Sequence, residues 1–529
     1  MSTGRDVDVL IIGSGPAGSM YARTIGEAVP HARILMVEVG PVVPGERGNH
    51  TQNMTEDARF AAQLLTQGPD AGVERAAALL DIAEGLDPSL EFRQTILPGL
   101  HFVDSKPELR DGEVGLPAAS MSTGVGGMGI HWGTSTPRPH QSERIPFIPE
   151  GEMDAALSHA EDVLRVTTQT PPGTGLAAEI YSAMADEFDG PGLTPVGFMP
   201  SATHWEGDRL VFSGTGAILG DLEETVPGFE LRSETLARRV LVEDGVAVGA
   251  ELENRRTGER YTVRAARVVV CADGLRTPQV LFASGVRPDA LGHHLNEHFQ
   301  MASFVVLNDD FDPSRFERDP KALGYVLVPF SDARPMQGGV MALAGSPYAL
   351  ALGDDATAQR LGILAWYAAK DVRFEDAVEF SDTETDFYGM PRMSIRYSRT
   401  PRDLEVIEEM RRNSVRAAER IGTLTEQPTL AAGGSSLHYQ GTVRMGAADD
   451  GTSVCDDRLR VWGVENLYVG GNGVIPTATA ANPTLTTVAL AWRAARELAA
   501  SLSADLADAA STAPAASTTA SAPIPGSGA

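Results

Sequence analysis

The sequence predicts a mixed α/β (α+β) fold with a Rossmann-like nucleotide-binding domain and a discontinuous, sheet-containing substrate (cap) domain. Three observations support this prediction. A buried strand, a glycine-rich turn and a helix open the chain between residues 7 and 28. A second strand that ends in an acid follows at 33–38. Further short apolar strands with glycine turns come near residues 270 and 470, which indicates a sheet interrupted by a second unit.

The opening turn has the spacing of a dinucleotide fingerprint. Gly13 permits the tight turn, Gly15 lets backbone approach a pyrophosphate, and Gly18 lets the helix pack on the strand. Ala17 belongs to the same turn and is expected to line the site. An ordinary glycine turn before a helix is the alternative. Glu38, twenty residues after Gly18 (38 − 18 = 20), favours the nucleotide site because its carboxylate would accept hydrogen bonds from ribose hydroxyls.

The composition of the chain argues against several classes of binding partner. The chain has 529 residues, 42% hydrophobic and 22% charged, as in ordinary globular proteins. A formal net charge of -28 argues against nucleic acid and anionic membranes as partners, since both require a basic face. Cys271 and Cys455 are expected to be free thiols, and no metal-ligand cluster is predicted. No signal peptide or apolar span is recognisable, so we expect a cytoplasmic protein without a membrane segment.

A second glycine-rich segment runs from Ser122 to Thr134, with five glycines among residues 124–133. Such density indicates backbone packed against a large flat group, where side chains would collide. Gly127 and Met128 would lie on that surface, with His131 and Trp132 beside it. A core histidine satisfied by the backbone remains the alternative for His131.

The rest of the chain divides by pattern. Strands are expected at 229–242 and 247–252, with Ala237 at the nucleotide site, and again at 268–272. We assign 1–150, 231–300 and 436–502 to the nucleotide domain and 151–230 and 301–435 to the substrate-binding domain. Residues 503–529, rich in Ala, Ser, Thr and Pro, are expected to form a disordered tail.

Polar residues flanked by glycines gather near the C-terminus. His438 opens the segment 438–446, Asn472 and Gly473 follow a last short strand, and Asn482 and Thr484 open the closing helix. A buried hydrogen-bonded histidine and an Asn that only caps the helix are the structural alternatives for His438 and Asn482.

Taken together, these glycine segments resemble the glucose-methanol-choline (GMC) flavoprotein oxidoreductases over nearly the whole chain. The resemblance implies that Gly13, Gly15 and Gly18 hold the pyrophosphate of FAD and that Glu38 holds its adenosine ribose. It also implies a catalytic pair at His438 and Asn482, 44 residues apart (482 − 438 = 44).

Within that family the chain is most similar to pyranose oxidases and bacterial glycoside 3-oxidases, some of which act on C-glycosides. Pyranose oxidases carry a Ser-Thr-His-Trp motif whose histidine bears a covalent flavin. Here His131 and Trp132 are kept, while Gly129 and Ile130 replace Ser and Thr. Non-covalent FAD is therefore favoured, with a link through His131 as the alternative.

The resemblance implies oxidation of a secondary hydroxyl, at C2 or C3 of a pyranose sugar or glycoside, to a ketone. Hydride would pass to flavin N5 and O2 would reoxidise the flavin. A histidine near its ordinary pKa of about 6.5 suits the proton step, so His438 is the expected base and Asn482 would orient the same oxygen. Two alternatives stay open: a dehydrogenase that uses a quinone or protein acceptor, and a non-redox flavin-binding lyase.

Overall fold

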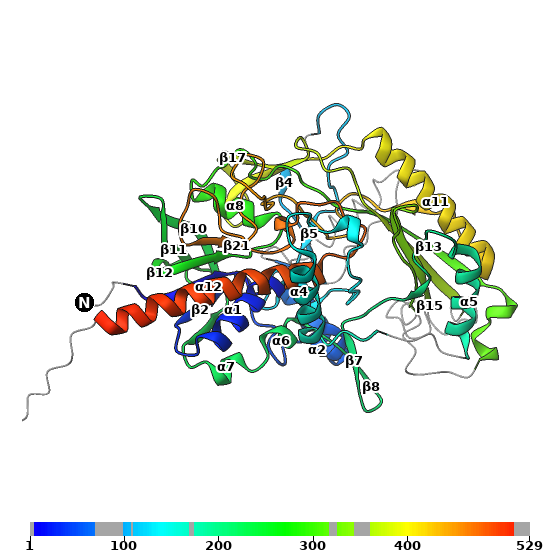
Figure 1. Ribbon diagram of the computed structural model, residues 1–529, viewed down its shortest axis with the longest axis horizontal. Helices are drawn as coiled ribbons and strands as arrows, with labels where there is room; N and C mark the ends of the chain where they lie inside the picture. The colour runs from blue at the N-terminus through cyan, green and yellow to red at the C-terminus, as the bar shows by residue number, and fades with distance from the viewer. Residues whose placement is uncertain are drawn as a thin grey trace, which may run out of the picture.

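The computed structural model describes residues 5–68, 99–106, 109–168, 174–316, 325–342 and 360–512. Two units lie side by side along its longest axis, each built around a seven-stranded sheet (Figure 1). The predicted mixed α/β fold is confirmed.

The first sheet contains the predicted nucleotide-binding strands. Its parallel part runs β9 (Phe229–Arg232), β2 (Ile34–Val37), β1 (Val7–Ile12), β12 (Arg260–Val270) and β21 (Leu467–Val469). These strands come from the start, middle and end of the chain. The last of them, β21, begins 460 residues after β1 (467 − 7 = 460). Strand β2 is a continuous apolar run, and β1 is apolar except for Asp8, which pairs with Arg33, as expected for parallel strands buried on both faces.

Strand β12 belongs to two ladders. Its second half, from Ala265 to Val270, runs parallel to β1, whereas Arg260 to Arg264 pair antiparallel with β11 (Val246–Asn254). Strand β10 (Thr235–Glu243) completes that antiparallel extension. The strands predicted at 229–242, 247–252 and 268–272 therefore all join one sheet.

Helices α1 (Pro16–Ala28) and α12 (Thr484–Thr512) pack against each other beside this sheet (Figure 1). Helix α12 continues ten residues beyond the predicted end at 502, and Leu506 still packs against the core. Alanine-rich sequence favours helix. Arg267 of β12 also pairs with Asp505 in the added turns. Of the predicted disordered tail, residues 513–529 lie outside the described residues.

Helix α4 (Glu150–Val163) packs on α12 within the core of the first unit. His159 stacks on Trp492 with ring centroids 4.3 Å apart, and Arg493 donates to Glu152. Because the 151–230 segment is assigned to the substrate-binding domain on sequence pattern, this packing is a departure from that expectation. Helices α6 (Thr215–Leu219) and α7 (Leu222–Thr225) likewise pack on α1.

The second sheet is antiparallel and carries the order β19-β13-β16-β15-β14-β6. Its strands are β6 (Gly197–Phe198), β13 (Phe299–Leu307), β14 (Tyr325–Val328), β15 (Met336–Ala342), β16 (Leu361–Ala368) and β19 (Gly422–Leu424), with β20 (Thr429–Leu430) beside β13. Helices α5 (Leu176–Phe188) and α11 (Pro401–Ile421) cover one face of this sheet (Figure 1).

The remaining strands and two further helices lie outside these two sheets. They are β17 (Ala377–Thr385), β18 (Pro391–Arg396), β4 (Ser105–Lys106), the pairs β3 (His101–Phe102) with β5 (Ser120–Met121) and β7 (Thr203–Glu206) with β8 (Arg209–Phe212), and the helices α2 (Glu56–Thr66) and α8 (Arg276–Ala283).

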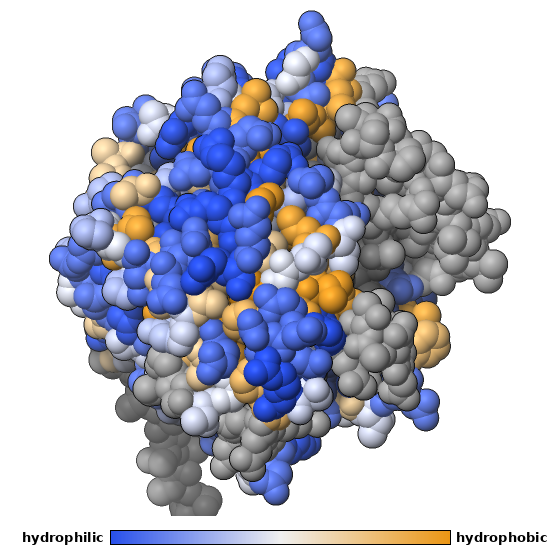
Figure 2. Space-filling view, turned by 90° about the vertical axis from the view of Figure 1, so that its right-hand side faces the viewer, coloured by the Kyte–Doolittle hydropathy of each residue, from blue (hydrophilic) through white to orange (hydrophobic). Residues whose placement is uncertain are grey.

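The outer surface of the second unit is largely polar. Figure 2 shows hydrophilic residues over most of its described surface, with apolar residues scattered between them. Helix α11 exposes Arg402, Glu405 and Arg412 and buries Val406, Ile407 and Met410 against the sheet.

Cys271 and Cys455 are free, as expected, and both are buried. Within the described ranges, no helix has the length and apolar character needed to cross a bilayer, and no metal-ligand cluster is found.

Candidate active site

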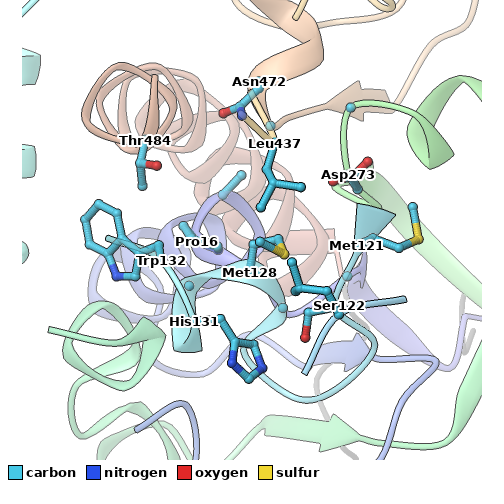
Figure 3. A pocket seen from close by; sticks show the side chains of 18 of the residues that line it. Pro16, Met121, Ser122, Met128, His131, Trp132, Asp273, Leu437, Asn472 and Thr484 are labelled. Carbon is cyan, nitrogen blue, oxygen red and sulfur yellow. The ribbon is translucent and has the colours of Figure 1, made fainter. Parts of the chain in front are cut away.

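A cavity of about 770 Å³ lies between the two units and is lined by segments from the start, middle and end of the chain. Figure 3 shows Pro16, Met128, Asp273, Leu437 and Thr484 around it, from elements that are far apart in sequence. Of the predicted site residues, thirteen line the cavity: Gly13, Gly15, Ala17, Glu38, Gly127, Met128, His131, Trp132, Ala237, His438, Asn472, Asn482 and Thr484.

The three fingerprint glycines differ in what surrounds them. Gly13 has φ +103°, and a Cβ there would lie 2.3 Å from the carbonyl oxygen of Cys271. A Cβ on Gly18 would lie 2.1 Å from the carbonyl oxygen of Gly13, so Gly18 supports the turn from beneath and does not line the cavity. A Cβ on Gly15 would meet no atom within 4 Å. Of the three glycines, only Gly15 faces open space, as a phosphate that approaches the turn requires.

The N-terminus of α1 faces this space without a side-chain cap. Gly15 is its N-cap and supplies no side-chain acceptor, and the first turn carries no acidic residue. Several other helices, α4 and α8 among them, also lack a side-chain cap, so it is the open approach at Gly15 that distinguishes α1. Free N–H groups at a helix N-terminus bind anions. The cavity therefore fits a dinucleotide whose phosphates lie at Gly15.

Glu38 connects the fingerprint to the second glycine-rich segment. Its carboxylate accepts from the hydroxyl of Ser14 (2.7 Å) and the backbone N–H of Gly40 (3.0 Å). The N–H of Gly126 donates in turn to the Ser14 hydroxyl (3.0 Å). Burial raises the pKa of Glu38, and these hydrogen bonds oppose that shift. The carboxylate is thus held at the cavity wall at the end of β2.

The second glycine-rich segment lies directly over the fingerprint. It forms a short 3₁₀ turn at Gly127–Ile130, and a Cβ on Gly127 would lie 3.2 Å from the Cα of Gly15. Trp132 is fixed by a hydrogen bond from its indole nitrogen to the carbonyl of Ser213 (2.9 Å). The close approach of the two turns explains the density of glycine that the sequence shows.

His131 lines the cavity, but its ring is engaged elsewhere. Its Nε2 lies 3.2 Å from the hydroxyl of Thr66, and the ring packs against Gly99, where a Cβ would lie 2.5 Å from the ring. Burial lowers the pKa of His131 to about 4, so the ring is neutral at ordinary pH.

The C-terminal segments close the cavity. Thr484 and Thr487 of α12 and Asn472 line it, and the hydroxyl of Thr487 donates to the side-chain oxygen of Asn472 (2.5 Å). Gly473 is the second predicted residue, with Gly18, that does not line it. A Cβ on Gly473 would lie 2.8 Å from the hydroxyl of Thr442, so this glycine permits packing beneath Asn472.

His438 and Asn482 meet in the same cavity, each held by a side chain of the second unit. Nδ1 of His438 lies 2.7 Å from Nε2 of His298, just before β13. The side-chain oxygen of Asn482 accepts a hydrogen bond from Gln337 on β15 (2.9 Å). Burial, with a smaller contribution from His298, holds the pKa of His438 well below 6.5, so the ordinary value expected from the sequence is wrong.

Two buried carboxylates anchor the loops that carry this pair. Glu297 accepts from the N–H of Gly434 and the hydroxyl of Ser436 (both 2.6 Å), two to four residues before His438. Glu143 accepts from the N–H of Ala480 (2.5 Å), two residues before Asn482. Burial raises the pKa of both carboxyl groups, that of Glu297 to about 7.

Four further residues of this site, His298, Gln337, Glu143 and Glu297, were not predicted from the sequence. The one usable signal was the polar run Asn296-Glu297-His298 directly before an apolar strand. The polar floor of the cavity was not predicted either; it is a cross-strand row in which Tyr367 pairs with Gln300 on one side and with Gln337 on the other. Gln300 and Tyr367 line the cavity.

Comparison with known proteins shows the family of this chain. Family models described as GMC oxidoreductase match residues 151–300 and 377–491. A C-glycoside 3-oxidase from Microbacterium trichothecenolyticum is 45% identical over 515 residues, 95% of this chain and 98% of that relative. The chain belongs to the GMC oxidoreductase family. Members of this family are flavoproteins that generally bind FAD, so the chain is an oxidoreductase with a flavin-type site.

Two further relatives and one solved structure extend the comparison. A C-glycoside 3-oxidase from Arthrobacter globiformis is 42% identical (94% of this chain, 96% of the relative). A pyranose 2-oxidase from Tricholoma matsutake is 28% identical (92% and 93%). The crystal structure of a pyridoxine 4-oxidase from "Mesorbium loti" aligns with a TM-score of 0.63 at 17% identity, covering 93% of this chain and 99% of that one, a likeness of fold.

Proposed function

We propose that this chain is an FAD-dependent oxidase that converts a secondary hydroxyl of a pyranose sugar or glycoside, C-glycosides included, to a ketone with O2 as the electron acceptor. One observation carries the proposal: a single cavity joins an uncapped dinucleotide cradle to His438 and Asn482. Relatives at 45% and 42% identity favour C3 of a glycoside over C2.

FAD, when bound, supplies the acceptor for the hydride that leaves the substrate carbon. The residues of the chain supply binding and proton transfer. Gly13, Gly15 and the N-terminus of α1 would hold the phosphates, and Glu38 would hold the ribose. Met128, Trp132, Ala237 and Thr484 line the remaining wall against the cofactor.

His438 acts as the general base. Because Nδ1 is engaged with His298, Nε2 is the nitrogen that remains for the substrate hydroxyl, and a neutral ring has the free electron pair that takes the proton. Asn482 directs its amide N–H groups to the same oxygen, since its side-chain oxygen is occupied by Gln337.

We propose non-covalent FAD. The hydrogen bond between His131 Nε2 and Thr66 keeps one ring nitrogen occupied, and Gly129 and Ile130 replace the Ser and Thr of covalent relatives. Precipitation of the holoprotein with acid should leave all of the yellow colour in the supernatant. A yellow pellet would show a covalent link and contradict this part of the proposal.

Flavin reduction under anaerobic conditions tests the function. Free sugars, O-glycosides and C-glycosides are added separately to the yellow holoprotein, and bleaching is followed by absorbance. We expect rapid bleaching by a glycoside and rapid recolouring with peroxide release on re-aeration. Slow recolouring would favour a dehydrogenase with another acceptor. Absence of bleaching by every substrate would contradict the redox function and leave a non-redox flavoprotein.

A further inference from the structure

His298 and His438 form a buried pair of imidazoles at the base of the active site. Nε2 of His298 lies 2.7 Å from Nδ1 of His438, and the rings stand edge to face at 83° with centroids 4.7 Å apart. Only one of the two nitrogens can carry the proton of this hydrogen bond. If Nδ1 of His438 carries it, Nε2 has a free electron pair; if Nε2 of His298 carries it, Nε2 of His438 holds the other proton and is blocked as a base.

The surroundings of His298 select between these two arrangements. With its Nε2 accepting, His298 must carry its own proton on Nδ1. That nitrogen is buried and has no hydrogen-bond partner among the described residues, and a buried N–H there requires an acceptor. The backbone groups of Ala480 and Thr479 lie beside the His298 ring and partly offset the burial that lowers its pKa to about 4. Because Nε2 faces His438, Nδ1 is the nitrogen left for their carbonyl oxygens. A donor at Nδ1 is favoured there, and Nε2 becomes the acceptor.

The backbone around the pair leaves it little freedom. Asn296 and Gln440, each two residues from one of the histidines, exchange both backbone hydrogen bonds (2.9 and 2.7 Å). Glu297 holds Gly434 and Ser436 at the base of the His438 loop. The ring of His298 also lies against Tyr367, with centroids 4.9 Å apart. The two imidazoles are thus held at hydrogen-bond distance by residues on both sides.

We propose that His298 is a positioning residue that fixes the Nδ1–H tautomer of His438 and so keeps its Nε2 free to accept the substrate's hydroxyl proton. The inference rests on the proposed function. In the reaction, the O–H bond of the substrate breaks and its proton forms a bond to Nε2 of His438, while the carbon-bound hydrogen leaves with two electrons for FAD. The resulting imidazolium donates from Nδ1 to neutral His298, a charge-assisted hydrogen bond.

Two substitutions at one position separate positioning from structure. His298→Leu removes the acceptor, whereas His298→Gln keeps an oxygen or nitrogen near the place of Nε2 and can both accept from His438 and donate to the Ala480 carbonyl. The rate of flavin reduction should fall by about 10- to 100-fold in His298→Leu, a part of what general base catalysis contributes, and by less than about tenfold in His298→Gln. The FAD content and the substrate dissociation constant should stay within about threefold of the parent.

Matched controls use His293, on the same segment. Its ring bonds the carbonyl of Phe374 (2.8 Å) and stacks on that ring, away from the cavity lining. His293→Leu and His293→Gln should leave flavin reduction unchanged. Equal losses in His298→Leu and His298→Gln, or parental rates in both, would overturn the proposal.

The tautomer itself gives a readout that needs no substrate. In the protein labelled with 15N-histidine, the signals of His438 are assigned by their loss in His438→Ala. We expect the Nδ1–H tautomer in the parent and in His298→Gln, and loss of that preference in His298→Leu. An Nε2–H tautomer in the parent would overturn the inference even if glycosides reduce the flavin. The expected tautomer without bleaching by any glycoside would instead contradict the proposed function alone.

Discussion

The nucleotide cradle and the catalytic corner share one cavity but are assembled in different ways. The cradle is built by neighbouring residues: Gly13 to Gly18 form one turn, and Glu38 follows on the next strand. The corner is built by His298, Gln337, His438 and Asn482, which come from separate elements of both units. A local pattern can therefore encode where the cofactor's phosphates bind, whereas the orientation of the catalytic groups depends on tertiary packing.

The largest expected effects come from alanine substitutions of two cradle glycines, Gly18 and Gly15, and they differ in kind. Gly18→Ala places a Cβ 2.1 Å from the carbonyl of Gly13, a backbone atom that cannot move aside, so we expect no soluble folded protein. Gly15→Ala meets open space, and its φ of -67° suits alanine. That variant should fold with a parental apoprotein melting temperature but bind FAD at least about tenfold more weakly, because the Cβ occupies the phosphate's approach. Melting and FAD titration measure both; full FAD affinity in Gly15→Ala would contradict the placement of the phosphates.

A substitution in the catalytic corner should slow flavin reduction while the nucleotide cradle still binds FAD. Asn482→Ala removes the N–H donor to the reacting oxygen and should slow flavin reduction by about 10- to 100-fold, with bound FAD retained. Asn308→Ala, an exposed N-cap in the second unit, is the control and should change the rate little. A parental rate in Asn482→Ala would remove this residue from the chemistry.

The smallest expected effect is the pH dependence of flavin reduction between pH 6.5 and 8.5. His438 must be deprotonated to act as a base, so the rate falls as pH falls through its pKa. Burial and the neighbouring His298 hold that pKa well below 6.5, and Glu297 faces the loop rather than the ring. The rate should therefore change by less than about twofold in this range and decline only at lower pH. A midpoint at or above pH 6.5 would contradict the assignment of a buried neutral base.

Much of the cradle could be predicted from sequence because each feature has a local cause. The turn at Gly13 and the uncapped helix at Pro16 follow from steric limits within a few residues. The mixed α/β fold could be predicted because four of the five parallel strands, β1, β2, β12 and β21, are followed closely by glycine turns or acids.

What could not be predicted depends on which surfaces meet. The amphipathic pattern of α4 shows that one face is buried, but it does not show that the partner is Trp492 on α12. In the same way, nothing local to His298 or Gln337 indicates contact with residues 140 and 145 positions later in the chain. The roles proposed for His438 and Asn482 came from family resemblance; their meeting in one cavity is a property of the fold.

The central claim is that cofactor binding and proton transfer are separable in one cavity, and His438→Ala tests it most directly. Rapid-mixing of the FAD-loaded variant with a reducing glycoside under anaerobic conditions measures flavin reduction, with His31→Ala on the exposed surface as control. The account predicts a rate at least about 10²-fold lower with an unchanged FAD content and a parental rate in the control. Near-parental reduction in His438→Ala, or loss of FAD with the side chain, would contradict it.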